Sequence, residues 1–159
     1  MSERKDVNGY RARSLGRVLA FQASYQMELN RSEPYDWEEA LELYCAESQT
    51  FPSGEEREKA LSFAKRLFEG VIDRRVEVDR ILNEALDKRS LKQTNVVDRS
   101  ILRIATYEAR FLKTPKPVVI SEAIDLGLRF GDKGSRAFLN GVLDQVDKVE
   151  TAPFGTSEA

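Results

Sequence analysis

Three arginines near the N-terminus, Arg11, Arg13 and Arg17, have the residue type and spacing to bind phosphate groups. Arg13 and Arg17 lie four residues apart, which places them on one face of a helix, one turn from each other. A guanidinium group is planar and can donate two hydrogen bonds to one phosphate. The same arginines could instead pair with the acidic segment 33–58, and spacing alone favours neither interpretation.

Charge is unevenly distributed along this chain of 159 residues, whose net charge is −2. Residues 1–17 contain five basic and two acidic residues, whereas residues 33–58 contain one basic and nine acidic residues. This asymmetry indicates a local anion-binding end, although charged runs also occur as ordinary solvated surface.

The composition argues against an enzyme and against a metal or cofactor site. Histidine is absent, and Cys45 is the only cysteine, so the commonest acid–base group and the usual structural zinc ligands are missing. A lone cysteine fits a reducing, cytoplasmic setting. No apolar run reaches the roughly 18 residues of a membrane-spanning helix.

Apolar residues recur with helical spacing over most of the chain, which predicts an all-α protein of about six to seven helices. The first helix is expected to start between Tyr10 and Ser14. One long helix of about 30 residues is expected from Gly54 to Ala85, with a kink near Gly70. The helix that starts after Asn95 should bury one face and display Arg99 and Arg103 on another. Expected domain limits are a flexible tail (1–9), an N-terminal helical subdomain (10–86), a connector (87–94), a C-terminal helical subdomain (95–150) and a disordered tail (151–159).

Helix boundaries are predicted from capping residues and helix breakers. Asp36, Ser53, Asn95 and Ser135 have the type and position of N-caps. Pro117 suits the first turn of a helix. Gly131 is expected to end that helix in a left-handed conformation.

Three segments together resemble the NusB family of bacterial transcription antitermination and ribosomal RNA biogenesis factors. They are Arg17–Tyr25, Val97–Glu108 and the segment from Pro117 to Asp144, which contains Phe138-Leu-Asn-Gly-Val-Leu-Asp. Their order and separation also match, so the resemblance covers about residues 11–148.

The resemblance implies two small helical bundles packed roughly perpendicular to each other. It also implies a non-enzymatic function within the transcription elongation complex: binding boxA-type single-stranded RNA as a heterodimer with the ribosomal protein NusE. The implied RNA-binding residues are Arg11, Arg13, Arg17, Lys133, Ser135, Arg136 and Phe138. Tyr25 and Gln22 are the implied partner-facing residues, although a tyrosine on that face is more often part of a core.

Some positions depart from the family pattern. Ser14 and Leu15 thin the N-terminal basic cluster, and Arg89 and Gln93 stand where the connector often carries a tryptophan and an arginine. Phe138 would stack on a base or, alternatively, belong to the core. Two other functions stay open: a protein–protein adaptor with little RNA contact, or a fragment of a NusB-domain ribosomal RNA methyltransferase. A homodimer is also possible.

Overall fold

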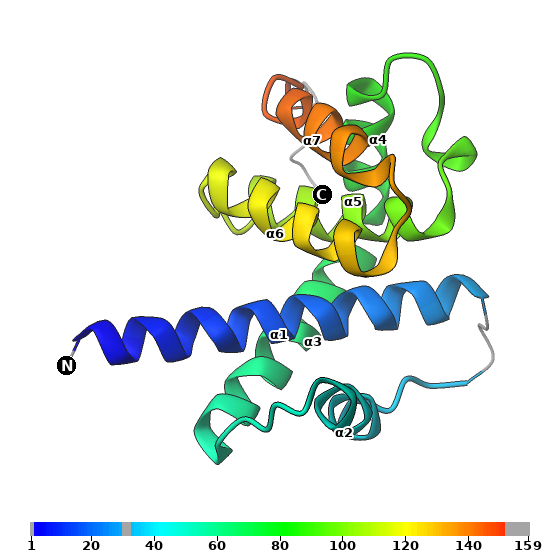
Figure 1. Ribbon diagram of the computed structural model, residues 1–159. Helices are drawn as coiled ribbons and strands as arrows, with labels where there is room; N and C mark the ends of the chain where they lie inside the picture. The colour runs from blue at the N-terminus through cyan, green and yellow to red at the C-terminus, as the bar shows by residue number, and fades with distance from the viewer. Residues whose placement is uncertain (1, 30–32, 152–159) are drawn as a thin grey trace. The chain divides into compact units, whose positions relative to one another are not determined.

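A computed structural model describes residues 2–29 and 33–151, and this part of the chain contains helices and no β-strand (Figure 1). The all-α prediction is therefore confirmed. The elements are α1 (Ser2–Leu29), α2 (Trp37–Ser48), α3 (Gly54–Asp73), α4 (Arg75–Ala85), a short 3-10 helix η1 (Leu91–Gln93), α5 (Val96–Arg110), α6 (Lys116–Phe130) and α7 (Ser135–Val146). They form two compact units, residues 1–73 and 74–159.

Helix α1 begins at Ser2, so the helix start predicted between Tyr10 and Ser14 is wrong, and the flexible tail over residues 1–9 stays a prediction. The segment is polar, but it contains no proline, and Glu3, Arg4 and Lys5 are strong helix formers. At the other end of the chain, a disordered tail was predicted over residues 151–159. Residues 152–159 lie outside the part that the structure describes.

In the first unit, α1 packs along α3, and α2 contacts both helices. Gly16 allows the close approach, because a Cβ atom there would lie 2.9 Å from the Ala60 carbonyl oxygen and 3.0 Å from Phe63. The buried apolar side chains of this unit include Val18, Leu19, Phe21, Leu41, Ala60, Ala64, Leu67 and Val71.

The predicted 30-residue helix is two helices, which separate at Arg74 (φ −106°, ψ 21°). Gly70 lies buried within α3 and causes no break. The apolar positions of α3 face α1, whereas those of α4 face α5 and α7. The interruption at Arg74 lies between the two cores, and α4 belongs to the second unit. The subdomain boundary therefore falls after Asp73, ahead of the connector 87–94 where it was predicted.

The second unit is organised around α5, which contacts α4, α6 and α7. Its buried apolar side chains include Val78, Ile81, Leu82, Leu91, Ile101, Leu102, Ile104, Val119, Leu126, Leu139, Leu143 and Val146. Helices α6 and α7 lie side by side (Figure 1). They are joined by an exposed ion pair in which Lys116 Nζ lies 2.6 Å from Asp144 Oδ1. Hydrogen bonding to Lys116 lowers the pKa of the Asp144 carboxyl below its usual value.

Helix α5 is covered on more of its circumference than its apolar stripe predicts. Arg103 was expected on a displayed face, but it is buried and binds Asp79 of α4 through Nε (2.9 Å) and Nη2 (3.2 Å). Asp79 also accepts a hydrogen bond from Arg75 at 3.3 Å. The arginine therefore joins α5 to α4, because a buried guanidinium requires a paired acceptor.

We expect Asp79→Ala to lower the free energy of unfolding by about 1–2 kcal/mol, because it removes two hydrogen bonds from a buried guanidinium. Partial exposure of the Asp79 side chain (27%) keeps the effect below that of a fully buried pair. Urea unfolding would measure it, with Asp125→Ala as the control, since Asp125 is an exposed acid on α6. Equal effects of the two substitutions would contradict this role.

The predicted N-caps mostly agree with the structure. Asp36 accepts a hydrogen bond from the Glu39 amide (3.0 Å), Ser53 from the Glu56 amide (3.4 Å) and Asn95 from the Asp98 amide (2.9 Å). Pro117 lies in the first turn of α6, as predicted. Ser135, however, is the first residue of α7, and Gly134 occupies the cap position.

Gly131 does not adopt the predicted left-handed conformation, since its backbone is extended (φ −92°, ψ −166°). A glycine is required at position 131 because there is no room for a side chain. A Cβ atom there would overlap Ser135 Oγ and lie 2.8 Å from the Gly127 carbonyl oxygen. The residue is small because the start of α7 folds tightly against the end of α6.

Candidate nucleic-acid interface

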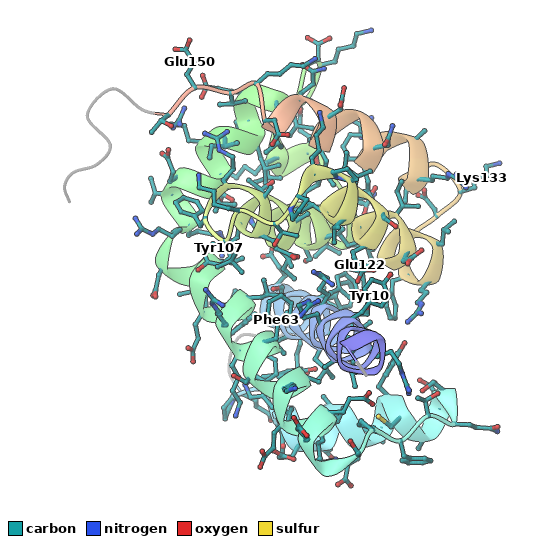
Figure 2. The ribbon with its side chains drawn as sticks, turned by 90° about the vertical axis from the view of Figure 1, so that its left-hand side faces the viewer. Tyr10, Phe63, Tyr107, Glu122, Lys133 and Glu150 are labelled. Atoms are coloured by element: carbon teal, nitrogen blue, oxygen red, sulfur yellow. The ribbon has the colours of Figure 1, made fainter. Side chains whose placement is uncertain are left out.

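The three N-terminal arginines lie on α1 but differ in what surrounds them. Arg11 and Arg13 are exposed, whereas Arg17 is only 3% exposed. The Arg17 guanidinium carbon lies over the Phe63 ring of α3, 5.3 Å from its centroid. Figure 2 shows Phe63 where α3 faces α1. The expectation that Arg13 and Arg17 are displayed together is therefore wrong, because α3 covers the second of them.

The acidic segment 33–58 reaches one of these arginines. Arg11 Nη2 lies 3.8 Å from Glu56 Oε1, and Glu56 is buried. Among the residues that the structure describes, Arg13 makes no ion pair, and its side chain is exposed. Arg57 of the acidic segment is itself paired with Glu38 and Glu42 of α2. Both interpretations of the basic cluster thus apply in part: Arg11 pairs internally, and Arg13 offers an exposed guanidinium.

Tyr25 and Gln22, the predicted partner-facing residues, are half-buried on α1. The Tyr25 ring lies 6.0 Å from the Phe21 ring, at an interplanar angle of 33°. Tyr25 therefore packs on its own helix along one edge while part of its surface stays accessible. This placement is compatible with a core-rim position or with a partner contact.

In the second unit, the turn 131–134 and the start of α7 are fixed by hydrogen bonds. Ser135 is buried; its hydroxyl donates to Asp98 Oδ1 (2.8 Å) and accepts from the Asp132 amide (3.1 Å). Asp132 Oδ1 accepts a hydrogen bond from the Gly134 amide (2.9 Å). Ser135, predicted as an RNA contact, is thus used to attach the first turn of α7 to α5.

One cation lies in this turn, and a second follows it in the first turn of α7. Lys133 and Arg136 are exposed, and in the described part of the chain neither side chain has an ion pair. Figure 2 shows Lys133 pointing away from the helices at one end of α7, with Glu150 beyond its other end. The turn therefore presents positive charge on a rigid support, an arrangement suited to phosphate groups.

Phe138, one turn into α7, is half-buried. It is therefore neither a fully enclosed core residue nor a freely exposed aromatic. Arg89 from the connector places its guanidinium carbon over the ring, 4.9 Å from the centroid. The sequence did not predict this neighbour, although the basic connector residues Lys88, Arg89 and Lys92 were its available signal.

No group of three or more potential metal ligands is present among the described residues. Cys45 is buried on α2, and burial raises the pKa of its thiol. In the same described part of the chain, no helix has the length and apolarity needed to cross a bilayer.

Comparison with known proteins agrees with this architecture. Residues 14–148 match the model of the NusB family. The transcription antitermination protein NusB of Desulforapulum autotrophicum is 35% identical over 151 residues, covering 92% of this chain and 98% of that protein.

Solved structures also match. The structure of T. maritima NusB is 37% identical, with a TM-score of 0.68, and covers 89% of this chain and 93% of that one. A structure of the antitermination factors NusB and NusE in complex with dsRNA is 27% identical, with a TM-score of 0.67, over 87% of this chain and 97% of that one. Sequence and fold thus agree over most of the length, and the chain belongs to the NusB family.

Proposed function

We propose that this chain is a transcription antitermination factor that binds boxA-type single-stranded RNA together with a NusE-type partner within the transcription elongation complex. The observation that carries the proposal is the start of α7. There, Lys133 and Arg136 are exposed on a hydrogen-bonded turn, and the half-buried Phe138 follows one turn later. Single-stranded RNA is bound by this combination of positive charge and a stacking group.

In the first unit, Arg13 has an exposed guanidinium and Arg11 has a long, half-exposed pairing with Glu56, and we assign both to RNA binding as a contact of that unit by itself. Arg17 and Ser135 act inside their own units, since Arg17 packs on Phe63 of the first unit and Ser135 binds Asp98 of the second. We assign partner binding to Tyr25 and Gln22. The relative that was solved with NusE and dsRNA supports RNA and a NusE-type protein as the classes of partner.

Few cations converge, and the net charge is −2, so RNA binding by the chain alone should be weak and sensitive to salt. A basic partner that contacts the same strand would raise the affinity by linking two weak sites. Fluorescence anisotropy of a labelled boxA-type strand, with and without the NusE-type partner, tests this. Tight binding by the isolated chain would contradict the heterodimer.

We expect Phe138→Ala to weaken RNA binding by the complex about 10-fold or more, because base–aromatic stacking contributes about 1–3 kcal/mol per base. Arg13→Ala should reduce the slope of log affinity against log salt by about 0.7, the value for one phosphate contact on a single strand. Arg66→Ala is the matched control for Arg13, since Arg66 is an exposed arginine of α3 in the same unit.

Equal effects of Arg13→Ala and Arg66→Ala would show general charge attraction instead of a site at Arg13. Unfolding of Phe138→Ala under conditions where the unsubstituted chain is folded would assign Phe138 to the core.

An adaptor function with little RNA contact is the alternative. It is favoured by two exposed apolar side chains, Leu43 (64%) and Phe51 (73%), within or beside the acidic α2 region. The test is RNA binding at low salt with the NusE-type partner present. If the chain binds the partner but the complex binds no RNA, the adaptor function is supported.

A further inference from the structure

Arg89 is held in place on the second unit although it lies in a connector. The residues that follow it form the 3-10 helix η1, whose Leu91 side chain is buried. The Leu91 amide donates to Asn83 Oδ1 of α4 (2.8 Å), and the Ser90 amide donates to Gln93 Oε1 (2.9 Å). The backbone at Arg89 is therefore attached to α4 and to its own turn.

The Arg89 guanidinium has an aromatic partner and no acidic one. Its carbon lies 4.9 Å from the Phe138 centroid. Among the described residues, no carboxylate forms an ion pair with Arg89, and the residue is exposed. The guanidinium thus lies over the ring in an exposed residue, and within the described part of the chain its charge has no ion-pair partner.

The chemistry of arginine suits this position to a nucleobase. The guanidinium is planar, delocalised and weakly hydrated, so it stacks on aromatic faces. Unpaired bases of single-stranded RNA stack on arginine planes as well as on aromatic rings. A guanidinium already backed by Phe138 is oriented before the base arrives, which reduces the entropy lost on binding.

We propose that Arg89 is an RNA-contacting residue, whose guanidinium, held on one side by Phe138, stacks a nucleobase on its other side. The inference rests on the proposed function, and it changes the role of Phe138 from the stacking surface itself to the support of that surface. Lys88 and Lys92, both exposed in the same connector, lie beside it and add positive charge for the strand.

Substitution by lysine separates stacking from charge. The experiment uses the full chain with its NusE-type partner and a labelled boxA-type strand. We expect Arg89→Lys to weaken binding about 10-fold, nearly as much as Arg89→Ala, because an ammonium retains the charge but loses the plane. Lys148→Ala, which removes an exposed charge beyond the other end of α7, should bind like the unsubstituted chain.

A scan with single abasic nucleotides locates the stacked base. At one position, loss of the base should weaken binding by the unsubstituted complex about 10-fold and barely affect the Arg89→Lys complex. In the Arg89→Lys complex, the further substitution Phe138→Ala should lower the RNA affinity only slightly, because the two side chains act as a unit.

Arg89→Lys binding equal to that of the unsubstituted complex would overturn the stacking role, as would an abasic scan in which both complexes lose affinity equally at every position. A lower urea midpoint for Arg89→Ala with unchanged RNA affinity would show that the contact with Phe138 serves only folding. In each of these cases the unsubstituted complex still binds RNA. Absence of RNA binding by the unsubstituted complex would instead overturn the proposed function together with this inference.

Discussion

Gly131→Ala is expected to lower the free energy of unfolding by about 2–4 kcal/mol, because the site has no space for a methyl group and its neighbours are fixed. The new Cβ atom would overlap Ser135 Oγ and approach the Gly127 carbonyl oxygen to 2.8 Å. A backbone oxygen inside a helix cannot move aside easily. Ser135 would have to shift, which breaks its hydrogen bonds to Asp98 and to the Asp132 amide.

The same substitution should weaken RNA binding even at temperatures where the protein is folded, because the displaced turn carries Lys133 and begins the helix that carries Arg136 and Phe138. Urea unfolding gives the stability, and anisotropy with the partner gives the affinity. Gly141→Ala is the matched control, since Gly141 is an exposed residue of α7 whose added Cβ would meet nothing within 4 Å.

Gly141→Ala should raise stability by about 0.5–1 kcal/mol through the lower backbone entropy of the unfolded chain. If the Gly131→Ala protein were as stable as the unsubstituted one, the turn would have relaxed without loss of stability. That result would contradict the claim that position 131 has no space for a methyl group.

Asp98→Ala is expected to lower the free energy of unfolding by about 2–3 kcal/mol, because Asp98 is a buried acceptor that joins two helices. It is 3% exposed, accepts the Ser135 hydroxyl hydrogen at 2.8 Å and accepts from Asn95 Nδ2 at 3.0 Å. Without the carboxylate, the Ser135 hydroxyl loses its acceptor on α5, and the first turn of α7 loses that attachment.

Asp98→Asn is the control that keeps the shape, and its remaining carbonyl oxygen can still accept from Ser135. Asp98→Asn should lower the free energy of unfolding by less than Asp98→Ala does. A double-mutant cycle with Ser135→Ala should give a clear coupling energy, because the two side chains form one hydrogen bond. Additive effects of Asp98→Ala and Ser135→Ala would contradict the assignment of Ser135 as a residue that positions α7.

Local signals in the sequence predicted most helices and several of their boundaries. Asp36, Ser53 and Asn95 cap helices as expected, since a cap depends on a side chain and an amide only three residues away. The short 3-10 helix Leu91–Gln93 lies within the segment predicted as a connector, where Leu91 is an apolar residue in an otherwise polar stretch. The predicted perpendicular arrangement of the two bundles and the possible homodimer stay predictions.

The predictions from sequence were wrong at positions where the local structure depends on the packing of one helix against another. The apolar stripes of α3 and α4 serve different cores, and the charged residues Arg74 and Arg75, which interrupt the apolar pattern, are the local signal of the break. The expected left-handed Gly131 followed the usual pattern of a helix end, but the residue is required by the approach of Ser135.

The sequence by itself determined the helical class, three of the four predicted N-caps and the family, because these depend on neighbouring residues and on motifs that can be read along the chain. Only the tertiary structure decided which polar residues are available to a ligand. Arg17 and Ser135 are enclosed by Phe63 and Asp98, whereas Arg89 comes to lie over Phe138. Exposure of a side chain is set by residues distant in sequence, and residue type and spacing along one helix do not contain that information.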